Sequence, residues 1–113
     1  MIDQLIIFQK LYDLFLYTHK TVAKFPKSQR FLLSNCLIQA ATEMMRLTII
    51  ANSKRERLEE QKELSVQLDL FRIHARTAKD LEFLPIKKYE YIMTLVNEIG
   101  KLLQAWMKVT GRG

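Results

Sequence analysis

The scarcity of chain-breaking residues is the feature that most restricts the fold of this chain. Its 113 residues include only three glycines and two prolines, although tight turns, β-bulges and phosphate-binding loops rely on both residue types. β-Sandwiches, Rossmann units and P-loops are therefore disfavoured. Pro26, Pro85 and the polar stretch 52–55 divide the chain into four long segments, which predicts a single all-α domain over residues 1–113, folded as an antiparallel up-down-up-down four-helix bundle. The expected helices cover about residues 2–23, 27–52, 54–83 and 86–109.

The cysteine count and the N-terminal sequence restrict the cellular compartment. Cys36 is the only cysteine and cannot form an intramolecular disulfide, so nothing indicates an oxidising compartment. Asp3 stands where a signal peptide would carry basic residues, and no apolar run approaches the roughly 20 residues that span a membrane. These features predict a cytoplasmic protein with no membrane partner.

Each of the first two segments carries two adjacent apolar stripes at helical spacing. In segment 2–23 one stripe consists of Ile2, Leu5, Ile6, Gln9, Tyr12, Leu16 and His19, and the other consists of Ile7, Leu11, Leu14 and Thr18. In segment 27–52 one stripe consists of Phe31, Ile38, Met45 and Ile49, and the other of Leu33, Leu37, Ala40, Met44, Leu47 and Ala51. A monomeric bundle needs one stripe per helix, so the additional stripes predict self-association.

Local signals predict details of the third and fourth helices. Ser53 and Glu56 stand three residues apart before a helical pattern, which predicts a capping box at the start of the third helix. Gly100 lies inside the fourth helix, where a glycine costs about 1 kcal/mol relative to alanine; it predicts the close approach of another helix. The residues that we assign to core packing rather than to base stacking are Phe15, Phe31, Phe71, Tyr89 and Trp106.

The net charge of +6, from 18 bases and 12 acids, is spread evenly along the sequence. Divided after Asn52, the first half carries six bases and three acids, and the second carries 12 bases and nine acids, so each half contributes +3. The sequence has no basic tail. Any strongly positive surface must therefore be assembled by folding.

Catalytic and metal sites are disfavoured. His19, His74 and Cys36 are the only imidazole or thiol ligands, and their spacing matches no zinc motif. No glutamate is followed three residues later by a histidine, as di-iron bundles require. The sequence thus predicts no catalytic residue, no metal and no cofactor. We interpret Cys36 as a small buried apolar residue, and His74 as a residue at the surface or its boundary.

The most distinctive polar pattern consists of Arg72, Arg76 and Lys79. Their spacing of i, i+4 and i+7 places them on one helix face. One interpretation is a solvated face on which Asp69 and Asp80 partly neutralise the bases. The other is a strip that binds phosphate or an acidic partner, because the arginine fork binds either group bidentately.

Other bases are candidates for extending this strip. Arg46 stands alone in a very apolar segment, where it could pair with Glu43 or Asp69, or could add to the basic surface. Further exposed candidates are Lys10, Lys24, Lys27 and Arg30, followed by Lys20, Lys87, Lys88, Lys101 and Lys108. Binding to nucleic acid by such a surface would follow backbone charge and shape more than base identity.

Four phrases of the sequence, in this order and at this spacing, carry a family resemblance. They are Phe25–Phe31, the run Leu68–Ile73 followed by Arg76 and Lys79, Lys88–Glu90, and Glu98–Trp106. Over about residues 17–108 the chain resembles small four-helix-bundle proteins of two kinds. These are the accessory variability determinant (Avd) proteins of diversity-generating retroelements and the proteins encoded by intervening sequences of bacterial 23S rRNA genes. The Leu68–Ile73 core and Trp106 favour the Avd branch.

The resemblance implies a non-enzymatic accessory protein that assembles as a homopentameric barrel. It also implies binding to the retroelement's reverse transcriptase and to template RNA or cDNA during mutagenic retrohoming, in which an RNA template is copied with substitutions at adenines. Basic residues of the bundle surface would make those contacts, and the strip Arg72, Arg76 and Lys79 matches this description best. The alternative is a stand-alone bundle protein of the rRNA intervening-sequence type, whose role is unclear.

Overall fold

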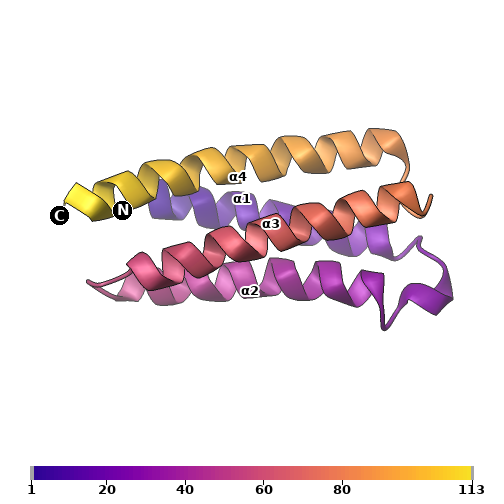
Figure 1. Cartoon of the computed structure of the whole chain (residues 1–113), viewed down its shortest axis with the longest axis horizontal. Coiled ribbons are helices and arrows are strands. Elements are labelled where there is room, and N and C mark those ends of the chain that lie inside the picture. Colours follow the sequence, from indigo (N-terminus) through magenta and orange to yellow (C-terminus); the bar gives the residue numbers. More distant parts are fainter. Residues whose placement is uncertain (1, 113) are drawn as a thin grey trace.

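The computed structural model describes the backbone of residues 2–112 and the side chains of residues 6–111. Its helices are α1 (Ile2–Val22), the short 3₁₀ helix η1 (Lys27–Gln29), α2 (Leu33–Ser53), α3 (Leu58–Asp80) and α4 (Ile86–Arg112), and residues 2–112 contain no strand. The four long helices alternate in direction and form a bundle of 46 × 24 × 18 Å (Figure 1). No helix within the described range is long and apolar enough to cross a bilayer.

Each long helix packs against two neighbours, and the contacting pairs are α1–α2, α2–α3, α3–α4 and α1–α4. One apolar stripe of every helix is buried between them. Phe71 and Trp106 are the largest side chains in this core, at most 2% exposed. The core stripe of α1 consists of Ile7, Leu11, Leu14 and Thr18, and that of α2 includes Leu37, Ala40, Met44, Leu47 and Ala51.

The start of the second helix differs from the prediction. Pro26 caps the short 3₁₀ helix rather than α2, and Leu32 then adopts a non-helical backbone conformation before α2 begins at Leu33. The assignment of Phe31 to the core was wrong, because its side chain is 82% exposed. The physical reason is that the interruption removes Phe31 from the helical register on which that assignment relied.

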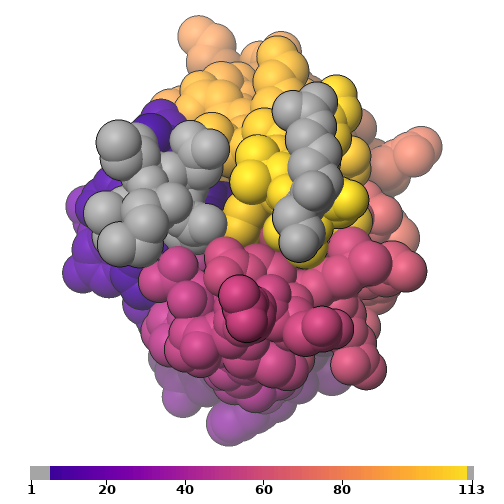
Figure 2. Space-filling model, turned by 90° about the vertical axis from the view of Figure 1, so that its left-hand side faces the viewer, coloured from indigo at the N-terminus to yellow at the C-terminus, as the bar shows by residue number. Residues whose placement is uncertain are grey.

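The predicted capping box was also wrong. Ser53 is the last residue of α2, and its hydroxyl donates a hydrogen bond to the carbonyl oxygen of Ile50 at 2.7 Å. Lys54 is extended, and α3 begins only at Leu58, without a side-chain cap. The Lys54 ammonium instead forms an ion pair with Glu60 at 2.7 Å. Serine that bonds back to its own helix is no longer available as an N-cap for the next one. Figure 2 views this end of the bundle, where the α2–α3 connection lies beside the last described turns of α4.

The connection between α3 and α4 contains the only positive φ among the described non-glycine residues. Glu82 has φ 66°, and the amides of Phe83 and Leu84 donate to the carbonyl oxygen of Ala78 at 2.9 and 3.1 Å. These hydrogen bonds form a C-terminal cap of α3. In such caps the residue in the left-handed conformation is usually glycine. A glutamate there carries a steric cost that glycine avoids.

We therefore expect Glu82→Gly to stabilise the fold by about 0.5–1 kcal/mol, because glycine adopts the left-handed conformation without strain. Thermal and urea unfolding measure the change. Glu82→Ala is the matched control, since it removes the same charge but keeps a Cβ atom and should bring no such gain. Equal stabilisation by both variants would contradict the role of the backbone and point to the charge instead.

Candidate nucleic-acid and partner interface

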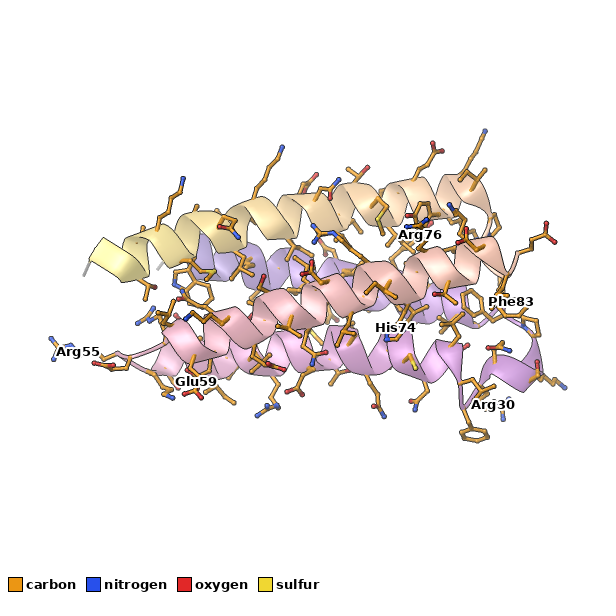
Figure 3. The ribbon with its side chains drawn as sticks, viewed as in Figure 1. Arg30, Arg55, Glu59, His74, Arg76 and Phe83 are labelled. Atoms are coloured by element: carbon orange, nitrogen blue, oxygen red, sulfur yellow. The ribbon has the colours of Figure 1, made fainter. Side chains whose placement is uncertain are left out.

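Folding concentrates positive charge at one end of the bundle. The last turn of α1, the connection to α2, the α3–α4 connection and the first turn of α4 meet there, at the right of Figure 1. We call residues 19–32 and 81–89 the loop end; the rings of Phe25 and Phe83, 6.1 Å apart, join its two parts. Figure 3 shows Arg30 and Phe83 at this end, and Arg55 and Glu59 at the other.

The loop end holds most of the net charge of the chain. Its bases are Lys20, Lys24, Lys27, Arg30, Lys87 and Lys88, and its single acid is Glu82. Six bases and one acid give +5, so the remaining 12 bases and 11 acids contribute only +1. A surface assembled from segments that are distant in sequence was expected, but its location could not be derived from charge counts along the chain.

Lys24 and Lys88 bring two positive charges together within the loop end. Desolvation lowers the pKa of Lys88, and the neighbouring charge of Lys24 lowers it further. No acid lies in the first turn of α4, although the positive end of the helix dipole favours negative side chains at that position. The positive charges at this position thus repel one another in the protein by itself, and they favour the binding of an anion.

Arg72, Arg76 and Lys79 lie on one helix, α3, as predicted, and each of the three pairs with a neighbouring carboxylate. Arg72 forms an ion pair with Asp69 at 2.9 Å. Asp80 lies 3.8 Å from the guanidinium of Arg76 and 3.3 Å from the ammonium of Lys79. The Lys79 ammonium also lies 4.8 Å from the centre of the Tyr89 ring. Arg76 is the most exposed base of the strip and faces the side of α4 in Figure 3.

Arg72 of the strip lines an open groove of about 730 Å³ between α3 and α4. Its polar lining consists of Ser65, Asp69, Arg72, Asn97, Lys101, Gln104 and Lys108. The sequence analysis assigned Lys101 and Lys108 only to a diffuse surface. Because they are seven residues apart, both lie on one face of α4, and this spacing was the signal that could have predicted a shared site. With three bases (Arg72, Lys101 and Lys108) and one acid (Asp69), the lining of the groove carries a net charge of +2.

Gly100 lies in this groove opposite Arg72. A Cβ atom at position 100 would stand 3.2 Å from a terminal nitrogen of the Arg72 guanidinium and 3.6 Å from Leu68. The same nitrogen of Arg72 reaches Asn97 on α4 at 3.5 Å. The glycine therefore accommodates the side chains of α3, and it leaves space for Arg72 to extend across α4.

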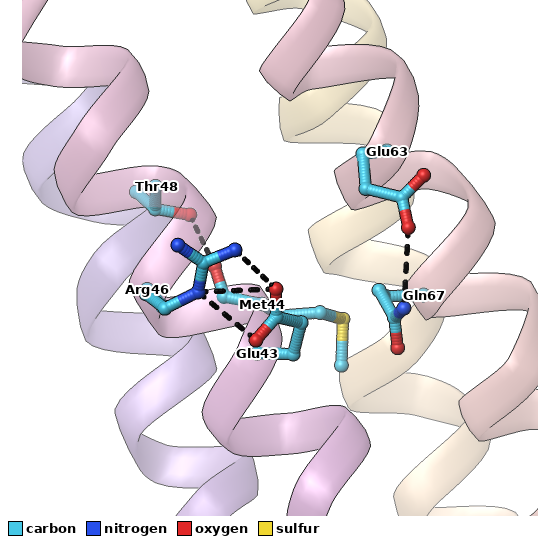
Figure 4. Close-up of polar contacts among 6 residues, drawn as sticks. All are labelled: Glu43, Met44, Arg46, Thr48, Glu63 and Gln67. Carbon is cyan, nitrogen blue, oxygen red and sulfur yellow. Dashed lines mark hydrogen bonds and ion pairs between the residues drawn. The ribbon is translucent and has the colours of Figure 1, made fainter.

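Two other predicted site residues lie away from both places. Arg46 is paired with Glu43 on α2, with hydrogen bonds of 3.0 and 3.1 Å from its Nε to the carboxylate (Figure 4); this contact lowers the pKa of Glu43. Lys10 on α1 forms an ion pair with Glu98 on α4 at 2.8 Å, which raises the pKa of Lys10. The eight predicted bases thus form no single surface. Lys24, Lys27 and Arg30 belong to the loop end, whereas Arg72, Arg76 and Lys79 lie on α3, and of these three only Arg72 lines the α3–α4 groove.

The second apolar stripes of α1 and α2 remain at the surface. Tyr12, Leu16 and Ile49 are between 40 and 58% exposed, whereas Ile38 and Met45 are partly buried. These residues form what we call the α1–α2 apolar face. Ile38 and His19 line the same hollow between the two helices, so the stripes adjoin there.

Thiol and imidazole groups do not assemble into a metal site. Cys36 is exposed, so its assignment as a buried apolar residue was wrong; it lines a hollow between α2 and α3 together with His74. Burial lowers the pKa of His74, which lies between α2 and α3 in Figure 3. Among the side chains of residues 6–111 there is no group of three or more potential metal ligands of the His, Cys, Asp or Glu type.

Comparison with known families agrees with the architecture. A family model described as bAvd-like matches residues 5–110, which is nearly the whole chain. The chain belongs to the bAvd-like family. No curated protein matches it. Family membership confirms the resemblance that the sequence phrases indicated and supports an accessory-protein role.

The space beside Gly100 gives a testable prediction. Gly100→Ala should stabilise α4 by up to about 1 kcal/mol through helix propensity, while its methyl group displaces the flexible end of Arg72 from Asn97. Thermal unfolding measures the first effect, and the side-chain resonances of Arg72 report the second.

The same substitution in an Arg72→Ala background is the control, because the displaced group is then absent and the full gain in helix propensity should appear. Destabilisation of both proteins by Gly100→Ala would show that the backbone, and not Arg72, requires the glycine.

Proposed function

We propose that this protein is the accessory subunit of a diversity-generating retroelement. In this role it binds the reverse transcriptase and template RNA or cDNA, is required for mutagenic retrohoming and performs no catalysis itself. The observation that carries the proposal is the bAvd-like match over residues 5–110. The concentrated charge of the loop end and the basic groove between α3 and α4 support contact with polyanions.

The proposal includes assembly as a homopentamer in the cytoplasm. The α1–α2 apolar face supports self-association, because a contiguous exposed apolar surface on a small domain is typical of an interface. The number of five subunits comes from the resemblance to Avd proteins. Gene neighbours distinguish the proposal from a 23S rRNA intervening-sequence protein: a reverse transcriptase gene with template and variable repeats supports the former, and a surrounding 23S rRNA gene supports the latter.

Leu16→Glu should disrupt self-association, because it places a charge in the centre of the α1–α2 apolar face. Light scattering is expected to show an assembly for the wild-type protein and a 13.4 kDa chain for the variant. Val109→Glu changes a similarly exposed apolar residue on α4 and should leave the assembly intact. A monomeric wild-type protein would contradict the pentamer.

Changing Arg72 and Arg76 together to glutamine should weaken capture of the reverse transcriptase and lower cDNA synthesis, since Arg72 lines the α3–α4 groove and Arg76 stands one turn further along the same face of α3. Co-expression with the neighbouring polymerase, followed by co-purification and cDNA quantification, measures the effect. The control is the double change of Arg55 and Lys62 to glutamine, which removes the same charge from exposed positions outside the groove and the loop end. Equal losses in both variants would indicate a general charge effect and refute the assignment of the groove.

A further inference from the structure

The hollow between the end of α1 and the start of α2 differs in charge from three other hollows of the described chain. It has a volume of about 420 Å³ and is lined by two bases, Lys27 and Arg30, and by no acid. The α3–α4 groove and two hollows between α2 and α3 contain carboxylates. Neither base joins any of the ion pairs between described side chains, and Arg30 lies at the loop end in Figure 3. This site, which we call the α1–α2 hollow, therefore has an uncompensated positive charge.

The first turn of α2 adds hydrogen-bond donors to the same place. The amide of Cys36 donates to the carbonyl oxygen of Leu32 at 3.0 Å, whereas the described backbone offers no acceptor to the amides of residues 33–35. No side chain caps this end of α2, and no acid lies in its first turn. The free amides and the positive end of the helix dipole thus favour an anion, and Ser34 and Asn35 of this turn line the hollow.

The Ser34 hydroxyl provides independent evidence for a ligand. Ser34 is only 8% exposed and lines the hollow, but its hydroxyl forms no hydrogen bond with another described residue. The buried hydroxyls of Thr18 and Thr48 instead donate to carbonyl oxygens of their own helices, at 2.6 and 2.8 Å. A buried polar group without a partner destabilises a fold, so we expect a ligand to accept a hydrogen bond from Ser34.

We propose that the α1–α2 hollow binds a segment of a partner protein in which a carboxylate lies next to a large apolar side chain. The carboxylate accepts hydrogen bonds from the Ser34 hydroxyl and from the free amides at the start of α2, and Lys27 and Arg30 complement its charge. Such a site goes beyond the proposed function, because it requires neither the α3–α4 groove nor contact with nucleic acid.

The apolar part of the lining favours a protein segment over a nucleic-acid strand. Half of the ten lining residues are apolar, namely Val22, Ala23, Phe25, Pro26 and Ile38. A sugar–phosphate backbone supplies an anion but no aliphatic group to bury against them, whereas a glutamate or aspartate beside a leucine or isoleucine supplies both. Phe31 and Leu32, which follow Arg30 in the sequence, are 82 and 59% exposed and offer further apolar surface at this end.

The test measures, by fluorescence anisotropy, the binding of the full chain to a short labelled peptide composed of leucine and glutamate. Two matched peptides change one property each, because one has glutamine in place of glutamate and the other has alanine in place of leucine. Ser34→Ala removes the buried hydroxyl, and Arg30→Gln removes a base. Their controls are Ser28→Ala and Lys87→Gln, which make comparable changes at exposed positions of the loop end outside the hollow. Circular dichroism verifies that all four variants are folded.

Ser34→Ala and Arg30→Gln should each weaken binding of the leucine–glutamate peptide about three- to tenfold, which corresponds to the loss of one hydrogen bond or ion pair. The two controls should leave the affinity nearly unchanged. Both matched peptides should bind more weakly than the parent peptide, because one lacks the carboxylates and the other lacks the large apolar side chains. Ser34→Ala should maintain or raise the thermal stability of the free protein, since the hydroxyl that it removes has no partner there.

Absence of peptide binding by the wild-type protein would overturn the proposal. Equal weakening by Lys87→Gln and Arg30→Gln would overturn it as well, by showing a general attraction to the positive loop end. Single-stranded RNA serves as a competitor, and if it displaces the peptide and its own binding weakens equally in the Ser34→Ala variant, the hollow is a nucleic-acid site instead.

Light scattering tests the remaining occupant, which is a second copy of the chain. If Ser34→Ala and Arg30→Gln dissociate an assembly that excludes the peptide, the hollow belongs to the contact between copies and the proposed partner segment is refuted. An assembly that persists in both variants while peptide binding weakens supports the partner segment.

Discussion

Burial of one apolar stripe from each of four helices is the constraint on which the rest of this structure depends. A helix that buries a single stripe needs partners on both sides of it, and an alternating bundle provides them with short connections. In that topology the first and third connections lie at the same end. The charges of residues 19–32 and 81–89 therefore add at one place, although neither segment is exceptional in the linear sequence.

The helical pattern was predictable because its period is determined by the backbone, and the number and order of the long helices follow from it. Which of the two neighbouring stripes on α1 is buried was not predictable. Ile7 and Tyr12 belong to stripes of similar apolar content, and only packing against the other helices decides which of the two is buried. Helix starts were predicted least well. Ser53 had the right spacing to Glu56 for a cap, but its hydroxyl was already bonded within the preceding helix.

In the candidate site too, features that depend on residues close in sequence were predictable, and features that depend on residues distant in sequence were not. The shared face of Arg72, Arg76 and Lys79 follows from helix geometry, and so does its neutralisation, because Asp69 and Asp80 stand one turn away from the arginines. The concentration of bases at the loop end depends on which connections of the bundle meet there. No periodicity in the sequence contains that information, which is why sequence reasoning favours the strip and underestimates the loop end.

In the proposed ring of subunits, the concentration of positive charge at the loop end of each bundle affects the stability of the assembly. Cyclic symmetry places equivalent surfaces of all subunits at the same height along the axis, so the five loop ends would share one rim, each with its charge of +5. Repulsion within that rim opposes assembly and weakens as salt screens it. A polyanion bound across several subunits neutralises the same repulsion. Nucleic-acid binding and assembly would then be thermodynamically linked, and each would increase the apparent affinity of the other.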